Sequence, residues 1–369
     1  MNNNTSILLI GPFPNPVSGV SLANKVVKEV LDHSTIFKTD IINTSYPIFE
    51  DAVGSFSFKK FIFFLKINFK IIKVFTNDII YITPGQTFFG VAKYGLFILL
   101  AAVLRKELII HVHGNFLNKQ YQNLKGFKKK LFYLLLSKFT KGIVLSPSLK
   151  VNLVPFLKES KIFVLYNFAE DYLCTETYSV EEPIKLRIAY LSNLMEEKGI
   201  LYLLDALKEL ENKNITYSAK IAGNIDEALK HIIIEKLNNL KSTEYLGIVY
   251  DKEKKELLDW SNIFILPTFY KMEGQPISIL EALATGNVII TTNHAGIPDI
   301  IKNKVHGYIV KPKDSQSILD SFLYLDKNKK KIELISKNNK IYFSENFTLK
   351  KFSKEIITIL NNDTKLKNI

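Results

Sequence analysis

Short apolar runs separated by segments with helical spacing recur along the whole chain. Runs typical of buried parallel strands occur at 6–10, 107–113, 143–145, 163–165, 186–191, 219–222, 263–266 and 288–291. Segments in which apolar residues return every three or four positions lie between them, at 21–31, 200–210 and 252–260. This alternation predicts an α/β protein built on parallel sheets.

The length of 369 residues favours two domains, each with its own core. A polar, Glu-rich stretch near the middle of the chain has the composition of a linker. We therefore predict a first domain over residues 1–169, a linker over 170–184, a second domain over 185–348, and a C-terminal helix over 349–369.

The segment 263–301 predicts a strand, a turn, a helix and a second strand in close succession. The strand 263–266 stops at Pro267, and Gly274 in the following turn lets the backbone approach a ligand. Pro276 suits the first position of a helix that we place at 277–284. The start of this helix faces the carboxyl end of the strand, where backbone amides bind anions.

Two glutamates, Glu273 and Glu281, flank this anion-binding corner. Their carboxylates would repel a phosphate unless they bind something else, and hydroxyl groups are the natural partners. A sugar nucleotide supplies both kinds of group, because its diphosphate can accept from the amides while its hydroxyls donate to the carboxylates. The segment therefore indicates a sugar-nucleotide site.

The Glu-x7-Glu spacing and its flanks resemble the retaining glycosyltransferases of family 4, of the bacterial surface-polysaccharide type. Residues 273–282 read EGQPISILEA, and residues 295–299 read AGIPD where the family usually has GGIPE. The resemblance implies the GT-B fold, with two doubly wound Rossmann-like domains facing each other across a cleft. The first domain would bind the acceptor, the second would bind the sugar nucleotide, and the C-terminal helix would pack back on the first.

The resemblance also implies the site residues. His113, at the end of a strand, Glu273 and Lys198 are the expected catalytic residues. Asn193 stands where the family has Arg, so Lys198 would hold the donor diphosphate largely alone. Glu273 would contact the transferred sugar and Glu281 the ribose. The full expected donor-binding set is Gly19, Val20, Asn193, Lys198, Gly223, Asn224, Ile248, Glu273, Gly274, Gln275, Pro276, Ile277, Ser278 and Glu281.

No metal and no cofactor are expected. His111 and His113 fall on the same side of their strand, and we interpret His111 as structural. A third His or Cys ligand at a matching spacing is missing from the sequence around them, and the family generally works without a bound metal.

The net charge of +13 is concentrated in the first half of the chain. Residues 1–165 carry 21 Lys and Arg against 8 Asp and Glu, whereas residues 166–369 carry 28 of each. An acidic partner is therefore expected, either nucleic acid, a phospholipid surface or a lipid diphosphate. We favour the last two, because no known nucleic-acid-binding motif interrupts this half.

Two stretches, 58–75 and 125–139, interleave lysines with large apolar residues. This pattern is typical of basic helices that lie in a membrane interface, although an ordinary packed helix with a solvated lysine face shows it too. The apolar stretch 94–104 is much shorter than the roughly 20 residues that span a bilayer. With the single Cys174 and no leader pattern at the N-terminus, we expect a cytoplasmic protein, peripheral on the inner face of the plasma membrane.

The expected activity is metal-independent transfer of a sugar, with retention, from a nucleotide-sugar donor to a glycan acceptor. That acceptor is expected to be lipid-linked, in the biosynthesis of O-antigen, capsule or lipopolysaccharide. Three alternatives stay open: a sugar-nucleotide epimerase of the same fold, a non-catalytic GT-B scaffold, and a nucleic-acid-binding protein.

Overall fold

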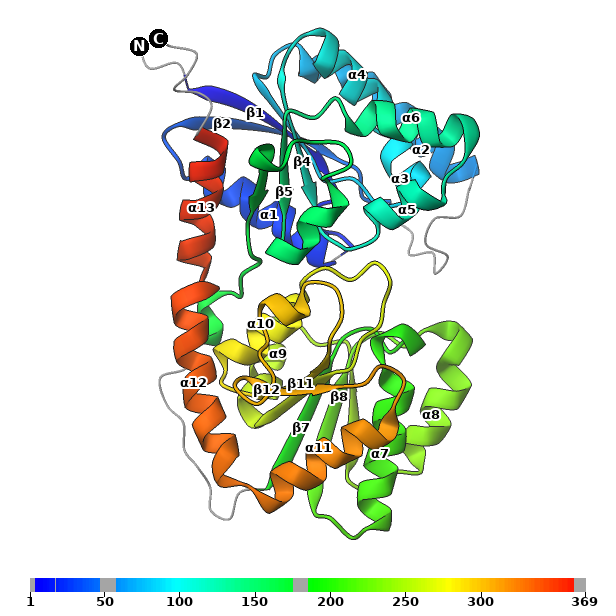
Figure 1. Cartoon of the computed structure of the whole chain (residues 1–369), viewed down its shortest axis with the longest axis vertical. Helices are drawn as coiled ribbons and strands as arrows, with labels where there is room; N and C mark the ends of the chain where they lie inside the picture. The colour runs from blue at the N-terminus through cyan, green and yellow to red at the C-terminus, as the bar shows by residue number, and fades with distance from the viewer. Residues whose placement is uncertain (1–3, 17, 47–57, 175–184, 362–369) are drawn as a thin grey trace. The chain divides into compact units, whose positions relative to one another are not determined.

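The chain forms two compact units in a computed structural model that describes residues 4–16, 18–46, 58–174 and 185–361, with only the backbone given for 58–61. The first unit comprises Met1–Tyr166, Met272–Gln275 and Phe352–Ile369, and the second comprises Asn167–Lys271 and Pro276–Lys351. Most of the predicted linker, residues 175–184, lies outside the described residues. Each unit is built around a six-stranded parallel sheet with helices on it (Figure 1).

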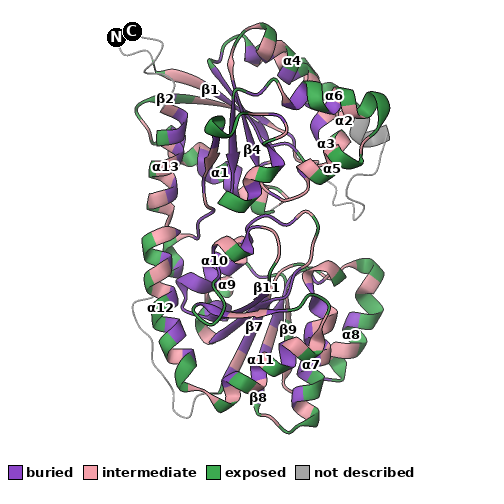
Figure 2. Ribbon diagram, in the orientation of Figure 1, coloured by how far each residue is buried: buried purple, intermediate pink, exposed green. Residues whose placement is uncertain are grey.

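The sheet of the first unit has the strand order β2-β1-β3-β4-β5-β6. All its pairings are parallel, and the central strands are apolar and buried, as Figure 2 shows. Its strands are β1 (Thr5–Gly11), β2 (Phe37–Asn43), β3 (Ile79–Ile82), β4 (Glu107–Val112), β5 (Lys141–Val144) and β6 (Ile162–Val164). The order reverses between β1 and β3, and the carboxyl edge at such a reversal is where open α/β sheets bind ligands.

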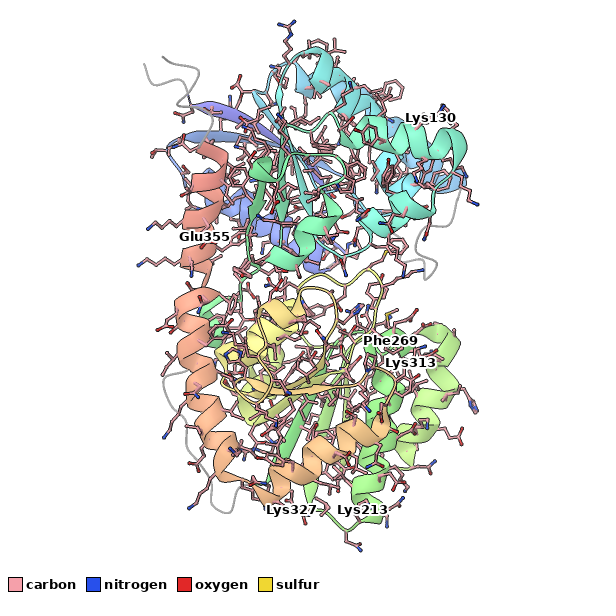
Figure 3. All side chains as sticks on the ribbon, viewed as in Figure 1. Lys130, Lys213, Phe269, Lys313, Lys327 and Glu355 are labelled. Carbon is pink, nitrogen blue, oxygen red and sulfur yellow. The ribbon has the colours of Figure 1, made fainter. Side chains whose placement is uncertain are left out.

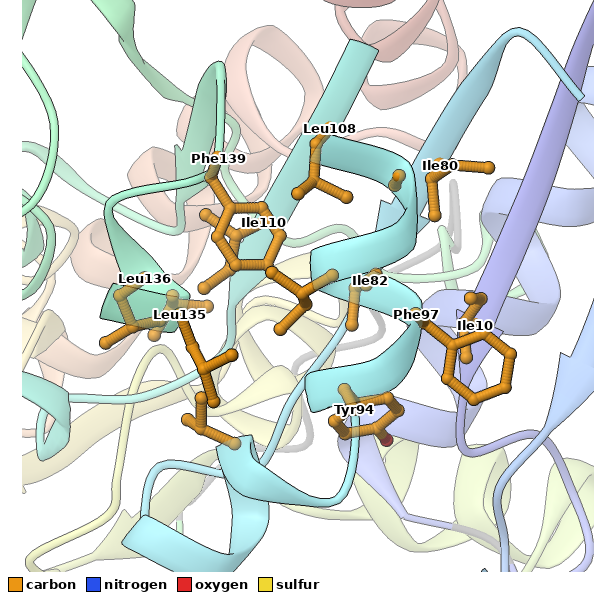
Figure 4. Close-up of a cluster of buried hydrophobic side chains, with 14 of the residues drawn as sticks. Ile10, Ile80, Ile82, Tyr94, Phe97, Leu108, Ile110, Leu135, Leu136 and Phe139 are labelled. Carbon is orange, nitrogen blue, oxygen red and sulfur yellow. The ribbon is translucent and has the colours of Figure 1, made fainter. Parts of the chain in front are cut away.

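The helices of the first unit are α1 (Gly19–Asp32), α2 (Phe58–Asn68), the 3-10 helix η1 (Phe69–Val74), α3 (Phe88–Ala92), α4 (Gly95–Val103), α5 (Leu117–Asn123) and α6 (Gly126–Leu136). Four short 3-10 helices, η2 (Pro147–Asn152), η3 (Glu159–Lys161), η4 (Asp171–Leu173) and η5 (Glu196–Lys198), follow in the chain, the last two in the second unit. Side chains of α4 and α6 pack on β1, β3 and β4 to form the core in Figure 4. Helix α1 packs on β1 and β2 from the opposite face of the sheet (Figure 1).

The second unit has the strand order β12-β11-β10-β7-β8-β9, again all parallel. The strands are β7 (Leu186–Leu191), β8 (Tyr217–Ala222), β9 (Thr243–Gly247), β10 (Ile263–Leu266), β11 (Val288–Thr292) and β12 (Gly307–Val310). This is the six-stranded dinucleotide-fold order, with its reversal between β7 and β10. The prediction of two doubly wound Rossmann-like domains is therefore confirmed.

The helices of the second unit cover both faces of its sheet. They are α7 (Ile200–Asn212), α8 (Lys230–Asn238), α9 (Asp251–Trp260), α10 (Ile277–Ala284), α11 (Ser315–Lys327) and α12 (Lys330–Asn346), with 3-10 turns η6 (Glu227–Leu229) and η7 (Ile297–Asp299). On one face α11 packs against α7, and on the other α10 packs against α12. The last helix, α13 (Leu349–Asn361), enters the first unit at Phe352, where its Ile359 carbonyl accepts a hydrogen bond from the buried Lys141.

Three local predictions need correction. The segment 58–75 is not one helix, because the Asn68 side chain donates to the Phe64 carbonyl at 3.0 Å and the chain continues as 3-10 turns. The helix predicted at 125–139 is shorter and spans Gly126–Leu136. Pro276 is the N-cap residue of α10, in an extended conformation, rather than its first helical residue.

The helix that the sequence predicts at 21–31 starts earlier, so that Gly19 and Val20 lie within it. They form the first turn of α1 and do not belong to the loop before it. The helix starts early because Ser18 and Ser21 cap it reciprocally: the Ser18 hydroxyl accepts from the Ser21 amide at 3.1 Å, and the Ser21 hydroxyl accepts from the Ser18 amide at 2.7 Å. Any contact of Gly19 and Val20 with a ligand would therefore use helix N-terminal amides.

Candidate functional site

The reversal point of the second sheet joins the loops that follow β7 and β10. The Phe269 amide and the Thr268 hydroxyl both donate to the Glu197 carbonyl, at 2.7 and 3.2 Å. Gly199 has a φ of +83°, and a Cβ there would lie 2.4 Å from the Pro267 carbonyl oxygen, so the junction requires glycine. The loop of Lys198 and the first residues of the loop after β10 are thus neighbours at the carboxyl edge of this sheet.

Lys198 lies at this junction, at the end of η5 and partly buried. Its Nζ is 5.2 Å from the centre of the Tyr270 ring, and Lys313 lies in the same way 4.7 Å from the ring of Phe269. Figure 3 labels Phe269 and Lys313 beside each other in the second unit. The turn after β10 therefore carries two aromatic rings, each with a lysine ammonium over it.

Asn193, Gly223 and Asn224 are joined at the ends of β7 and β8. The Leu194 amide donates to the Asn224 carbonyl at 2.7 Å. Gly223 has a φ of +141°, and a Cβ there would lie 1.8 Å from the Ser192 carbonyl oxygen. Asn193 is exposed, and its carbonyl accepts from the Tyr190 hydroxyl at 2.9 Å. Asn193 is therefore exposed at the position where the sequence resemblance leads us to expect Arg.

Ile248 follows β9 directly and is 51% exposed. The neighbouring Tyr245 hydroxyl donates to the Gly223 carbonyl at 2.9 Å, which ties the exit of β9 to the exit of β8. The loops after β7, β8, β9 and β10 thus share one edge of the sheet.

The start of α10 has free amides. Pro276, the N-cap, provides no side-chain hydrogen bond, so within the part of the chain that the structure describes no side-chain oxygen caps the Ile277 and Ser278 amides. These two residues are partly exposed, whereas Pro276 and the rest of α10 are buried. This helix start can bind an anion, as the sequence predicts.

Glu281 lies in the buried body of α10 and pairs with a residue that sequence reasoning did not select. Its Oε1 atom lies 2.6 Å from the Nζ atom of Lys254 on α9. Burial raises the pKa of Glu281, and the Lys254 ammonium opposes that rise. Burial alone would lower the pKa of Lys254, but the adjacent Glu281 carboxylate outweighs it and raises that pKa. Each of the two groups thus favours the charged form of the other.

Glu273 and Gly274 lie against the loop that follows β4, within the first unit. A Cβ on Gly274 would lie 2.6 Å from the His113 carbonyl oxygen, and a Cβ on Gly114 would lie 2.4 Å from the Met272 carbonyl oxygen. Glu273 and Gln275 are buried, with 8% and 3% of their surfaces exposed. The structure therefore brings the predicted pair His113 and Glu273 into adjoining loops.

Gln86 holds these two loops together. Its Nε2 atom donates to the Met272 carbonyl at 3.1 Å, and its Oε1 atom accepts from the Phe116 amide at 2.6 Å. Sequence reasoning missed Gln86, although its place four residues after β3, in the Pro-Gly-Gln turn at the carboxyl end of a strand, was a usable signal.

The partly buried His113 packs at a tilt against the buried His111. The ring centres of His111 and His113 are 3.9 Å apart, and the Tyr81 hydroxyl lies 2.5 Å from Nδ1 of His111. Burial lowers the pKa of His113 to about 4, and burial together with His113 lowers the pKa of His111 well below its usual value. His113 is thus neutral at pH 7, and among the described residues its Nε2 atom has no hydrogen-bond partner. It can offer a ligand a hydrogen bond but no charge.

A family model of known proteins matches part of this chain, mostly within the second unit. Residues 179–342 match the model of glycosyl transferases group 1. This match contains the loop of Lys198, both glutamates and α10. The matched segment therefore contains the site residues at the carboxyl edge of the second sheet, which are Lys198, Ile277, Ser278 and Glu281. We call them the carboxyl-edge site.

Individual relatives match parts of the chain. It is 28% identical over 146 residues to WcaL of Salmonella typhimurium, a putative colanic acid biosynthesis glycosyltransferase, covering 38% of this chain and 36% of the relative. It is 29% identical over 157 residues to an Escherichia coli UDP-Gal:alpha-D-GlcNAc-diphosphoundecaprenol alpha-1,3-galactosyltransferase, covering 41% and 39%. The chain spans less than half the length of the first four curated relatives that it matches, between 36% and 48%.

The fold extends the likeness over both units. Anabaena HepE, solved in complex with UDP-glucose, aligns with a TM-score of 0.73 over 96% of this chain and 99% of its own, at 14% identity. At that identity the alignment shows the fold alone, and it confirms the GT-B prediction.

Within residues 4–16, 18–46, 58–174 and 185–361, no three His, Cys, Asp or Glu side chains come together as a metal site. In the same ranges no helix has the length and apolarity needed to cross a bilayer.

Proposed function

We propose that this protein is a retaining glycosyltransferase that moves a sugar from a nucleotide-sugar donor to a lipid-linked glycan acceptor in surface-polysaccharide biosynthesis. The observation that carries the proposal is the carboxyl-edge site inside the glycosyl transferases group 1 segment. There Lys198, the uncapped amides of Ile277 and Ser278, and the carboxylate of Glu281 offer partners to the phosphates and hydroxyls of one donor.

The relatives support the choice of substrates. HepE binds UDP-glucose, and the Escherichia coli relative is named for a UDP-sugar donor and a diphosphoundecaprenol-linked acceptor. WcaL and other relatives are named for colanic acid, amylovoran and capsule biosynthesis. A nucleotide-sugar donor and a lipid-diphosphate acceptor fit both the carboxyl-edge site and the basic first half of this chain.

The proposed chemistry is a same-face displacement. The bond from the sugar's anomeric carbon to the donor phosphate oxygen breaks, and a bond to the acceptor hydroxyl oxygen forms on the same face. The leaving diphosphate takes the proton of that hydroxyl. Negative charge grows on the diphosphate as the bond breaks, and Lys198 with the α10 amides would stabilise it without a metal ion. His113 and Glu273 would hydrogen-bond the sugar as its ring flattens.

The proposal includes peripheral binding of the first unit to the anionic inner membrane surface, which would bring the enzyme to its acceptor. Large apolar side chains stand out of its helical layer, among them Phe69 on η1, Val103 on α4 and Phe127 on α6, which are 81%, 78% and 75% exposed. Lys128 and Lys130 on α6 are exposed as well, and Figure 3 labels Lys130 there. Apolar and cationic groups on one layer suit an anionic lipid interface.

A donor panel tests the function. The purified chain is titrated with UDP-, GDP-, ADP- and dTDP-sugars, and release of free sugar is measured for each without an acceptor. We expect one class to bind and to be hydrolysed slowly with retention of configuration. Conversion of the donor to an epimer would replace the proposal by the epimerase, and binding of none would support a scaffold.

A further inference from the structure

The ion pair of Lys254 and Glu281 is enclosed in the second unit. The Lys254 side chain is 13% exposed and that of Glu281 is 7% exposed. Lys254 Nζ also lies 3.5 Å from Oε2 of Glu170 and 5.7 Å from the centre of the Tyr172 ring. Three segments, α9, α10 and the residues before β7, therefore meet at one ammonium group.

A buried carboxylate needs such a partner to stay ionised. Glu281 has apolar neighbours in α10, where residues 279–284 are all buried. The groups that face it are Lys254 from α9, and Glu170 and Tyr172 from the segment before β7. Of these only Lys254 is cationic, while Glu170 disfavours a second negative charge. Without the ammonium, burial would favour the protonated form of the carboxyl group.

The two oxygens of Glu281 are used unequally. Among the described residues, Lys254 is the hydrogen-bond donor to Oε1, and no residue donates to Oε2. The carboxylate is thus held at one oxygen, and the other is left for a ligand. A protonated carboxyl group would accept hydroxyl hydrogen bonds much less well.

We propose that Lys254 is a positioning residue of the donor site, which keeps Glu281 ionised and oriented so that its Oε2 atom accepts a hydroxyl of the nucleotide sugar. The inference rests on the proposed function, because it takes Glu281 to bind a donor hydroxyl. An ion pair that only fastens α9 to α10 would affect folding but would give donor binding no dependence on pH.

The test is donor binding by full-length protein as a function of pH, with UDP-glucose as the probe because its diphosphate diester keeps a constant charge from pH 6 to 9. We expect Lys254→Met to bind about ten- to hundredfold more weakly than the parent at pH 7, the effect of one charged hydrogen bond. Its affinity should rise with pH as Glu281 ionises again. The parent and Lys254→Arg should show level profiles.

Control variants separate the outcomes. Lys255→Met removes the neighbouring lysine, which pairs with Asp259 at 2.6 Å on the same helix, and should bind like the parent. Lys254→Gln keeps a hydrogen-bond donor without charge and serves if the Met variant does not fold. Parent-like affinity of the uncharged variants at every pH would overturn the inference and leave the function standing. Failure of the parent itself to bind any nucleotide sugar would overturn both.

Discussion

Removing the Lys198 ammonium is the most informative single change to the proposed phosphate site. Lys198 lies where the loops after β7 and β10 join, and Asn193 stands where the sequence resemblance leads us to expect a second cation, Arg. Its Nζ atom lies 5.2 Å from the centre of the Tyr270 ring, in the turn that follows β10. Lys198→Ala leaves the backbone of this junction, which depends on Gly199, unchanged.

The size of the effect follows from the charge that Lys198 would neutralise. One hydrogen bond to a charged group contributes roughly 1.5–3 kcal/mol, which corresponds to about a ten- to hundredfold change in rate. Lys198 is only partly buried, so solvent screens part of its charge and a loss beyond this range is not expected. Because negative charge grows on the leaving group, we expect the loss mainly in kcat.

The assay is steady-state transfer or donor hydrolysis with the best donor of the panel. Lys213→Ala, an exposed lysine at the end of α7, is the matched control and should behave like the parent. Asn193→Arg added to Lys198→Ala should restore part of kcat, since it returns a cation to the exposed family position. Unchanged kinetics of Lys198→Ala would refute the reasoning and show that the diphosphate is held elsewhere.

Three further changes test other parts of the account. Glu273→Gln should mainly lower kcat, because contacts to the transferred sugar strengthen in the transition state. Glu281→Gln should mainly raise the donor KM, because contacts to the ribose do not strengthen there. The reverse pattern would exchange the roles of the two glutamates. Gln86→Ala removes two hydrogen bonds between the His113 and Glu273 loops, so it should lower kcat several-fold without changing the donor KM. Gln86→Glu keeps only the acceptor, and its kcat should lie between those of Gln86→Ala and the parent. Changing lysines 128–130 to Glu should release the protein from sedimenting anionic vesicles, at about 1 kcal/mol per lysine, while the same change at lysines 329–331 of the second unit should not.

The sequence predicted the second unit well because its signals are local. In the segment 263–284, Pro267, Gly274 and the apolar periodicity predict a strand, a turn and a helix. The structure has β10 and α10 at the predicted residues. The loop glycines were equally informative, since Gly199 and Gly223 stand where a side chain would collide with a neighbouring loop. Such backbone requirements can be recognised in the sequence because only glycine meets them.

What the sequence did not reveal depends on long-range contacts. Lys254 is one of several lysines on a strongly charged helix, and only the packing of α9 against α10 selects it as the partner of Glu281. Gln86 lies 186 residues from Met272 in the chain, and the residues around either position do not predict the hydrogen bond between them. The start of α1 at Gly19 was missed because the reciprocal cap of Ser18 and Ser21, which begins the helix before residue 21, was not recognised in the sequence.

The central claim is best tested by identifying the product. The chain is incubated with its preferred nucleotide sugar and a short undecaprenyl-diphosphate-linked glycan, and the product is analysed by mass spectrometry and by the proton NMR signal of its new anomeric centre. We expect that one sugar residue is added to the acceptor and that the new linkage keeps the anomeric configuration of the donor. An inverted linkage would contradict the retaining mechanism, and a donor recovered unchanged, or as an epimer, with an unmodified acceptor would contradict the proposed function itself.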